Sequence, residues 1–170
     1  PKGVILSHGG ILNNCDGALD ILKPLLTDQT RFLTWLPLSH SYEHTVQFVQ
    51  ISVGAKIFYA ESIEKLIKNM NDCKPQLMTA VPRFYQNLFQ KINASFNKAT
   101  GLKKKLILKM LELGTKKINK QSFTILERLI DNILEKIVRK KIKSQFGGEL
   151  KTFVSGGGAL DKEVGIFLNA

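Results

Sequence analysis

Cysteine is scarce in this chain, because its 170 residues include only two, Cys15 and Cys73. Their separation matches neither the short spacing of a zinc site nor the paired framework of a disulfide-rich domain. We therefore expect both to be reduced thiols in a reducing compartment.

Long apolar runs and acidic residues are also lacking. No run approaches the roughly 20 consecutive apolar residues that a helix needs to cross a bilayer. Only 14 Asp and Glu stand against 25 Lys and Arg, which gives a formal net charge of +11. With 44% hydrophobic residues and charges of both signs, the composition is that of a soluble globular protein that can bury a core.

The positive charge is concentrated in residues 98–143, which hold 14 Lys and Arg but only 4 Asp and Glu. A nucleic-acid-binding surface would interleave aromatic residues or glycines with its cations, whereas here they alternate with Leu and Ile, so we expect no nucleic-acid partner. Two interpretations remain. The segment is either a solvated helical face or a surface attracted to anionic lipid head groups.

Apolar runs along the chain predict alternating strands and helices. Strands are expected at residues 3–6, 31–36, 55–59, 76–81 and 150–154. Helices are expected at residues 10–22, 42–53 and 62–71, after Pro82 and from Asp161 onward. This alternation predicts an α/β fold with a parallel-rich sheet covered by helices.

A basic helical insertion at about 98–143 interrupts that alternation. We expect its first helix to end at Gly114 and the second to stop at Gly147-Gly148. In the second helix, apolar residues recur every four positions in two neighbouring stripes, Ile125, Leu129, Ile133 and Ile137 beside Leu126, Ile130, Leu134, Val138 and Ile142. We expect this wide face to be buried and the basic residues to point outward.

Four segments carry features of a ligand site. Residues 1–3 read Pro-Lys-Gly, in which a glycine permits close backbone approach to an anion and a lysine supplies charge. Residues 36–44 read Leu-Pro-Leu-Ser-His-Ser-Tyr-Glu-His, residues 79–85 read Thr-Ala-Val-Pro-Arg-Phe-Tyr, and residues 155–160 read Ser-Gly-Gly-Gly-Ala-Leu. No Gly-x-x-x-x-Gly-Lys-Ser/Thr run is present, which excludes an ordinary P-loop NTPase.

In this order and at these separations, the segments resemble those of the adenylate-forming (AMP-binding) superfamily, and most closely its long-chain fatty acyl-CoA synthetases. The resemblance covers residues 1–170, which we expect to be a partial AMP-binding domain from the large N-terminal domain of such an enzyme. The expected function is therefore that of an ATP-dependent acid–thiol ligase, which forms an acyl-adenylate from a fatty acid and transfers the acyl group to coenzyme A. The chain alone is expected to be inactive, because the family's magnesium-binding glutamate, ribose-binding aspartate and catalytic lysine are not in it.

The resemblance also assigns roles to individual residues. It places His40 beside the acyl carboxylate and phosphate as the catalytic candidate, where its ring would donate a hydrogen bond or shape the pocket. The nucleotide-binding candidates are Lys2, Gly3, Gly156, Gly157, Gly158 and Ala159, with Lys2 near the leaving pyrophosphate. At position 158, glycine replaces the alanine common in the family. ATP, Mg²⁺ and coenzyme A are implied, but we expect no metal ligand in this chain, because His40 and His44 lack the usual His-Glu-x-x-His order and a third ligand.

Other functions remain open at this point. A superfamily member that activates a different acid, medium-chain or aromatic, would carry similar segments. A non-catalytic basic module that docks on membranes would account for residues 98–143 alone. We expect a cytoplasmic protein, with peripheral contact to the anionic cytoplasmic membrane face as the corresponding hypothesis.

Overall fold

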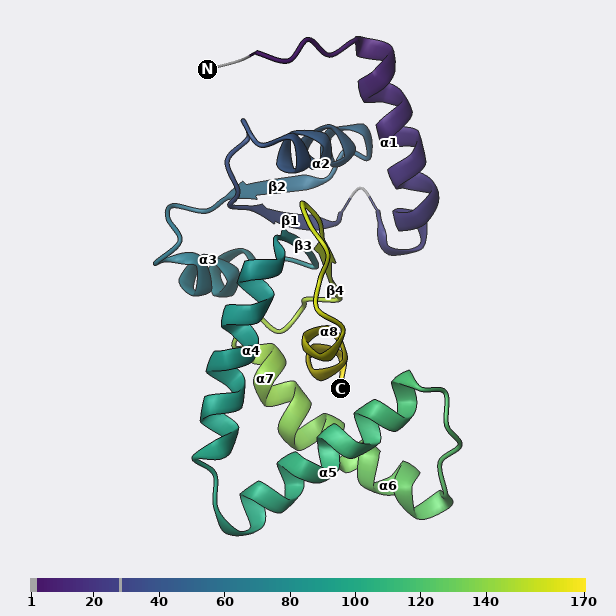
Figure 1. Ribbon diagram of the computed structural model, residues 1–170, viewed down its shortest axis with the longest axis vertical. Helices are drawn as coiled ribbons and strands as arrows, with labels where there is room; N and C mark the ends of the chain where they lie inside the picture. The colour runs from purple at the N-terminus through teal and green to yellow at the C-terminus, as the bar shows by residue number, and fades with distance from the viewer. Residues whose placement is uncertain (1–2, 28) are drawn as a thin grey trace. The chain divides into compact units, whose positions relative to one another are not determined.

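The computed structural model describes residues 3–27 and 29–170 of the chain. They form two compact units, whose elements are labelled in Figure 1. The first, which we call the sheet unit, runs to Thr79 and resumes with Phe146–Val154. The second, which we call the helical unit, comprises Ala80–Gln145 and Ser155–Ala170.

Four short strands form one all-parallel sheet in the order β2-β1-β3-β4. Their bounds are β1 (Arg31–Thr34), β2 (Lys56–Tyr59), β3 (Leu77–Ala80) and β4 (Thr152–Ser155). The central strands β1 and β3 are almost wholly buried, with Phe32 and Leu77 in register across the pair. Continuous apolar runs of this kind are typical of parallel strands covered on both faces. The predicted α/β fold with a parallel sheet is therefore confirmed.

Three α-helices and a short 3₁₀ turn complete the described part of the sheet unit. They are α1 (His8–Leu22), η1 (Lys23–Leu25), α2 (Ser41–Ser52) and α3 (Leu66–Cys73). α1 begins where Ser7 Oγ accepts a hydrogen bond from the Gly10 N–H at 3.1 Å, an ordinary N-cap. Ser62 was expected to cap α3, but the N-cap is Lys65, three residues later, and Ser62 accepts from the Lys65 N–H in the turn before the helix.

The predicted strand at residues 3–6 was wrong. This segment has no ladder partner in the described structure, and Val4 and Ile5 are 82% and 100% exposed. An apolar run becomes a strand only when a neighbouring strand satisfies its backbone groups. Composition could not reveal whether that neighbour exists.

Helices dominate the second unit, which confirms the predicted helical insertion. They are α4 (Pro82–Asn97), α5 (Gly101–Ile118), α6 (Ile125–Leu134), the π-helical η2 (Glu135–Arg139), α7 (Lys140–Ser144) and α8 (Lys162–Asn169). Their core centres on Met110, Leu113 and Leu134.

Gly114 does not end a helix as expected but lies inside α5, where a Cβ would come within 2.3 Å of the Ala170 backbone oxygen. The glycine therefore serves close packing rather than helix termination.

The expected burial of the α6 face was only half right. Ile130, Val138 and Ile142 pack against the helical core, together with the buried Leu134. The neighbouring stripe, Ile125, Leu129, Ile133 and Ile137, is exposed by 53% to 82%, and Leu126 at the start of the packed stripe is 67% exposed. Both stripes repeat every four residues, so periodicity could not decide which of them the core takes.

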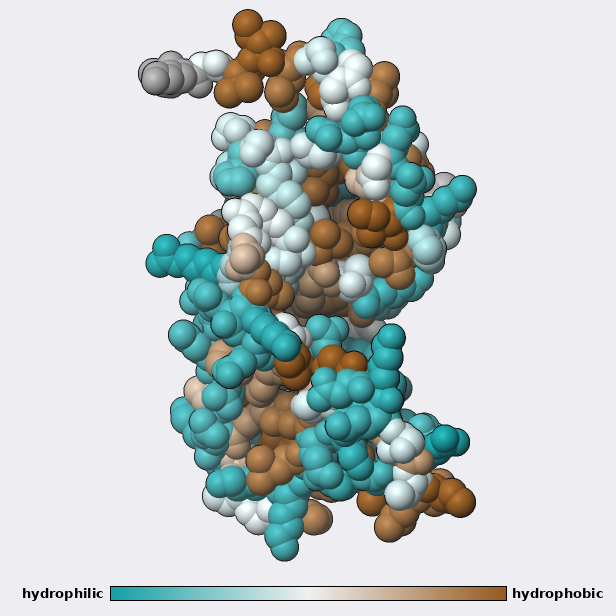
Figure 2. Space-filling model, turned by 45° about the vertical axis from the view of Figure 1, so that its right-hand side comes forward, coloured by the Kyte–Doolittle hydropathy of each residue, from teal (hydrophilic) through white to brown (hydrophobic). Residues whose placement is uncertain are grey.

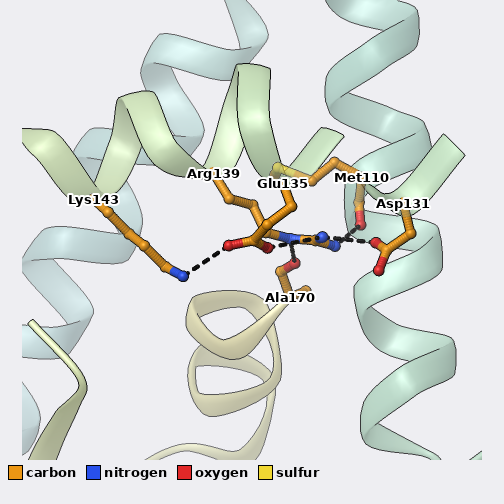
Figure 3. A network of polar contacts seen from close by, with 6 residues as sticks. All are labelled: Met110, Asp131, Glu135, Arg139, Lys143 and Ala170. Carbon is orange, nitrogen blue, oxygen red and sulfur yellow. Dashed lines mark hydrogen bonds and ion pairs between the residues drawn. The ribbon is translucent and has the colours of Figure 1, made fainter. Parts of the chain in front are cut away.

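Arg139 joins several helices of this unit (Figure 3). Its Nη1 donates to Asp131 Oδ1 at 2.6 Å, and its Nε donates to the Ala170 backbone oxygen at 2.8 Å. Its Nη2 donates to the backbone oxygen of Met110 on α5 at 3.3 Å. Because guanidinium and Asp131 side chains are both only 12% exposed, this pair is shielded from solvent. The N–H groups of Arg139 thereby supply hydrogen bonds to the Met110 and Ala170 carbonyls and to the Asp131 carboxylate, which helix packing shields from water.

We predict that Glu127 stabilises the helical unit in a pH-dependent way. Its carboxylate accepts from Lys116 and from the Thr124 N–H in a capping box, and these contacts lower its pKa to about 2. A lowered carboxyl pKa stabilises the fold above the ordinary value of 4.5, and this contribution is lost as pH falls toward 2. Urea unfolding should show the wild type more stable than Glu127→Gln at pH 6, with the difference vanishing near pH 2. Glu112→Gln, which breaks only an exposed pair with Lys109, is the control and should change little.

Candidate functional site

His40 is the N-cap of α2. Its backbone N–H donates to Pro37 O at 2.9 Å, closing the turn that leads from β1 into the helix. Its side-chain Nδ1 accepts a hydrogen bond from the Tyr42 N–H at 3.3 Å. A nitrogen that accepts carries no proton, so the neutral ring bears its hydrogen on Nε2. The exposed His40 therefore offers an N–H donor at the end of a strand-to-helix turn.

The first turn of α2 is bonded to the carboxyl-terminal edge of the sheet. Thr79 Oγ1 of β3 donates to Glu43 Oε2 at 3.0 Å, and Tyr42 OH donates to the Val154 backbone oxygen of β4 at 2.9 Å. The Trp35 indole N–H, just after β1, donates to Thr79 O at 2.8 Å. In open α/β sheets this edge is where ligands bind. His40 is therefore held where such a fold presents its ligand-binding groups.

Glu43 lies at the centre of these contacts and is fully buried. Burial raises the pKa of its carboxyl, while hydrogen bonds from Thr79 and Thr34 and the nearby His40 oppose that rise. Burial, with a smaller contribution from Glu43, raises the pKa of Tyr42 to about 12. Both side chains therefore keep their protons to a higher pH than they would in water.

From the sequence, no role was assigned to Glu43 or Tyr42, which tie the His40 turn to the sheet. Both appeared only as members of the 36–44 segment. Two signals were present: an acidic residue three positions after an N-cap, and a threonine in each of two otherwise apolar strands, Thr34 and Thr79. Extending the Phe32–Leu77 register by two residues places these threonines side by side on the face toward α2.

The glycine segment belongs to the helical unit. The Gly156 N–H donates to Ala80 O at 3.2 Å, which continues the strand pairing into the loop. Gly157 has a φ of 75°, a conformation that residues with a Cβ rarely adopt. Gly158 has no such constraint, since a Cβ there would meet Pro82 at an ordinary 3.6 Å. Gly157, Gly158 and Ala159 are exposed and can present flat backbone to a ligand.

The remaining nucleotide candidates lie at the beginning of the chain. Gly3 is exposed in the sheet unit and has no atom within 4 Å of a Cβ position. Lys2 lies outside the described residues. The structure thus places His40 and Gly3 in the sheet unit and Gly156, Gly157, Gly158 and Ala159 in the helical unit.

Within residues 3–27 and 29–170, no three His, Cys, Asp or Glu side chains gather closely enough to hold a metal ion. In the same residues, no helix combines the length and apolarity required to cross a bilayer.

We predict that the two glycines of this loop respond differently to alanine. Gly157→Ala should destabilise the protein by about 1–2 kcal/mol, because the left-handed backbone brings Cβ against the carbonyl oxygen. Gly158→Ala should be neutral or stabilising by up to about 1 kcal/mol, because it restricts the unfolded chain without a clash. Denaturant midpoints measure both, and equal losses would show that the φ of Gly157 does not govern this loop.

Comparisons with known proteins agree with this geometry. Residues 1–170 match the family of AMP-binding enzymes. The chain is 31% identical to Long-chain-fatty-acid--CoA ligase 5 of Rattus norvegicus, covering all of this chain and 24% of that protein. It is 29% identical to Long chain acyl-CoA synthetase 6, peroxisomal, of Arabidopsis thaliana (99% of this chain, 23% of that protein) and 29% identical to Fatty acyl-CoA synthetase A of Dictyostelium discoideum (100% and 24%).

The chain spans about a quarter of the length of these relatives. The match to the family, by contrast, extends over all 170 residues of this chain and includes both the His40 turn and the glycine segment. The chain therefore belongs to the AMP-binding enzyme family.

Proposed function

We propose that this chain is part of an ATP-dependent long-chain fatty acid–CoA ligase. The observation that carries the proposal is the His40 turn, which presents an N–H donor at the carboxyl end of a parallel sheet in a chain of the AMP-binding family. Two of its reported relatives are named as a long-chain-fatty-acid--CoA ligase and a long chain acyl-CoA synthetase, and the third as a fatty acyl-CoA synthetase, which supports the substrate class.

The proposed reaction has two steps. A carboxylate oxygen of the fatty acid attacks the α-phosphorus of ATP, and the bond to the leaving pyrophosphate breaks. The coenzyme A thiol then loses its proton, its sulfur bonds to the acyl carbon, and AMP leaves. Positioning and charge stabilisation are the protein's main contributions to such phosphorus chemistry.

Each candidate residue has one task in this proposal. His40 Nε2–H donates to an oxygen of the reacting carboxylate or α-phosphate. Lys2 and Gly3 contact the phosphates, with the lysine charge on the leaving pyrophosphate. Backbone of Gly156, Gly157, Gly158 and Ala159 lies against the nucleotide.

Magnesium enters this proposal only as the partner of ATP, whose phosphate charge it neutralises. The described residues contain no cluster of acidic, histidine or cysteine side chains that fits it. We therefore assign no step of this chain to the metal.

An enzyme that activates another acid is the alternative within the family. Competition between a long-chain acid and medium-chain or aromatic acids in pyrophosphate release distinguishes the two, using the full-length protein that contains this chain. Preference for the long-chain acid supports the proposal, and preference for another acid contradicts it.

We predict that His40→Ala lowers adenylation about 10²-fold or more, the typical effect of removing one preorganised donor. The substitution also removes an N-cap, which costs about 0.5–2 kcal/mol. His40→Asn separates these effects, because asparagine caps well but places no donor at the ring's Nε2 position. We expect His40→Asn to recover stability without recovering adenylation, in single-turnover assays of pyrophosphate release.

His44→Ala is the matched control, since His44 lies one turn further along α2 and packs edge-on against Phe48. It should retain adenylation. If His40→Asn restores both stability and activity, His40 is only a cap and its proposed role is wrong.

A second proposal concerns the basic helices. We infer that the exposed stripe of α6 and η2 (Ile125, Leu129, Ile133 and Ile137) docks on an anionic lipid surface, peripherally on the cytoplasmic membrane face. Figure 2 shows apolar atoms among the hydrophilic ones on the surface of the helical unit. An interfacial helix buries such a stripe in the lipid boundary and keeps its cations near the head groups.

The charge of the insertion supports this partner. All four of its acidic residues are in ion pairs within the unit, with Lys109, Lys116, Arg139 and Lys143. Its other ten Lys and Arg have no ion-pair partner among the described residues, and they include Arg128, Lys136 and Lys140 in and after α6. The apolar stripe is thus flanked by positive charge that the protein itself does not neutralise.

We predict that the full-length protein binds anionic vesicles more tightly than neutral ones, and less so as salt rises. Each cation near the bilayer contributes on the order of 1 kcal/mol, which salt screens. Replacing Lys103, Lys104, Lys105, Lys140 and Lys141 by Gln should abolish the preference, and replacing Ile125, Leu129 and Ile133 by Gln should weaken binding to all vesicles. Neither should alter adenylation of a soluble short acid.

The matched control replaces Ile21 and Ile63, which are 77% and 68% exposed on the sheet unit, by Gln. This variant should bind vesicles like the wild type. The contrary outcome is that the wild type does not bind vesicles and that replacing Ile125, Leu129 and Ile133 by Gln lowers folding stability. In that case protein rather than lipid covers the exposed stripe of α6.

A further inference from the structure

Two buried oxygens on α2 have no hydrogen-bond donor within the described part of the chain. They are Oε1 of Glu43 and Oε1 of Gln47. The two residues are four positions apart on a helix, so their side chains are neighbours on one face. Buried polar atoms are almost always satisfied, and an unsatisfied one costs about 1–3 kcal/mol. Two such acceptors side by side therefore need an explanation.

One proton on Glu43 can satisfy both atoms, because side chains four residues apart on a helix lie within reach of each other. A protonated carboxyl carries an O–H donor, which Gln47 Oε1 can accept, while Oε2 keeps its hydrogen bond from Thr79. An ionised carboxyl offers only acceptors, which leaves Gln47 Oε1 without a donor and a fully buried charge without a cationic hydrogen-bond partner.

We infer that Glu43 is a neutral carboxylic acid that shares its proton with Gln47, and that this pair is the positioning device for His40. Glu43, through Thr79 of β3, and the Tyr42 hydroxyl, through Val154 of β4, hold the first turn of α2 against the sheet. That turn supplies the Tyr42 N–H that fixes the His40 ring and directs Nε2–H outward. The importance of this orientation for catalysis rests on the proposed function.

The charges around Glu43 are consistent with a neutral acid. Among the described residues, the one titratable group that acts on it is His40, which lowers its pKa as the smallest influence. Tyr42, whose own pKa Glu43 raises, lies in the same turn, and β1 and β3 face Glu43 with the hydroxyls of Thr34 and Thr79. Burial, the largest influence, raises its pKa. A raised carboxyl pKa means that stability falls as pH rises from 4.5 through the raised value. The reason is that ionising the carboxyl costs more free energy in the folded state, where it is buried, than in the unfolded state.

Infrared difference spectra of the full-length protein test the protonation directly. At pH 7, the wild type should show a carboxylic-acid carbonyl band that shifts in D₂O and is missing from Glu43→Gln. In Gln47→Leu, the band should move to higher frequency, because its hydrogen-bond acceptor is gone. Absence of the band at pH 7 shows an ionised Glu43 and overturns the inference.

The positioning role is read from the nitrogen-15 signals of the His40 ring, which report its tautomer without any assay of activity. Glu43→Gln mimics a neutral acid, because its amide N–H donates to Gln47 while its oxygen accepts from Thr79. It should keep the wild-type ring signals and adenylation within about threefold. Glu43→Leu should mix the two tautomers and lower kcat about 10²-fold, as misplaced groups do, with the KM for ATP nearly unchanged.

Failure of this inference differs from failure of the proposed function. Unchanged ring signals in Glu43→Leu overturn the positioning role whatever the activity. Disturbed ring signals with normal adenylation leave the positioning intact and contradict the proposed role of His40. If Glu43→Leu does not fold, Tyr42→Phe and Gln47→Leu give the same readout with smaller changes, and wild-type ring signals in both would likewise overturn it.

Discussion

The buried carboxyl of Glu43 is the constraint on which the sheet unit's candidate site depends. A fully buried carboxyl must be matched by hydrogen bonds, and its partner Thr79 belongs to β3 while its helix begins at His40. Whatever holds Glu43 therefore also fixes where α2 begins relative to the strand ends. The exposed ring of His40 is held by its hydrogen bond from the Tyr42 N–H, and we infer that the buried Glu43 fixes the turn that supplies this donor.

The sequence was sufficient to predict features that depend only on the residues of one segment. The buried strands β1 and β3 were predicted because their apolar residues leave no exposed face, and the helical insertion because its apolar residues recur at helical spacing. The strand expected at residues 3–6 failed for the opposite reason, since pairing depends on a partner elsewhere. The same holds for Gly114, whose place inside α5 is explained by its close approach to Ala170, a contact distant in sequence.

The candidate site divides in the same way. His40 and the glycine segment could be named from residue type and order, although their roles remain predictions. The N-cap geometry that sets the tautomer of His40, and the burial of Glu43, arise only when α2 packs on β3 and β4. For α6, the two stripes repeat alike in sequence, and only packing against Met110 and Leu113 reveals that the core takes the stripe that contains Leu134.

Electrostatics gives a reason for the protonation state proposed for Glu43. On the proposed function, the His40 turn faces a fatty carboxylate and a triphosphate, so nearby negative charge would raise the free energy of every anionic species there. A neutral acid keeps the geometry of two hydrogen bonds without that repulsion. The basic insertion shows the complementary arrangement, since each of its acidic residues is paired with a Lys or Arg and an excess of positive charge remains. Glu43 and the four acidic residues of the insertion thus add structure without uncompensated negative charge, which on the proposed function suits a protein that binds anionic substrates.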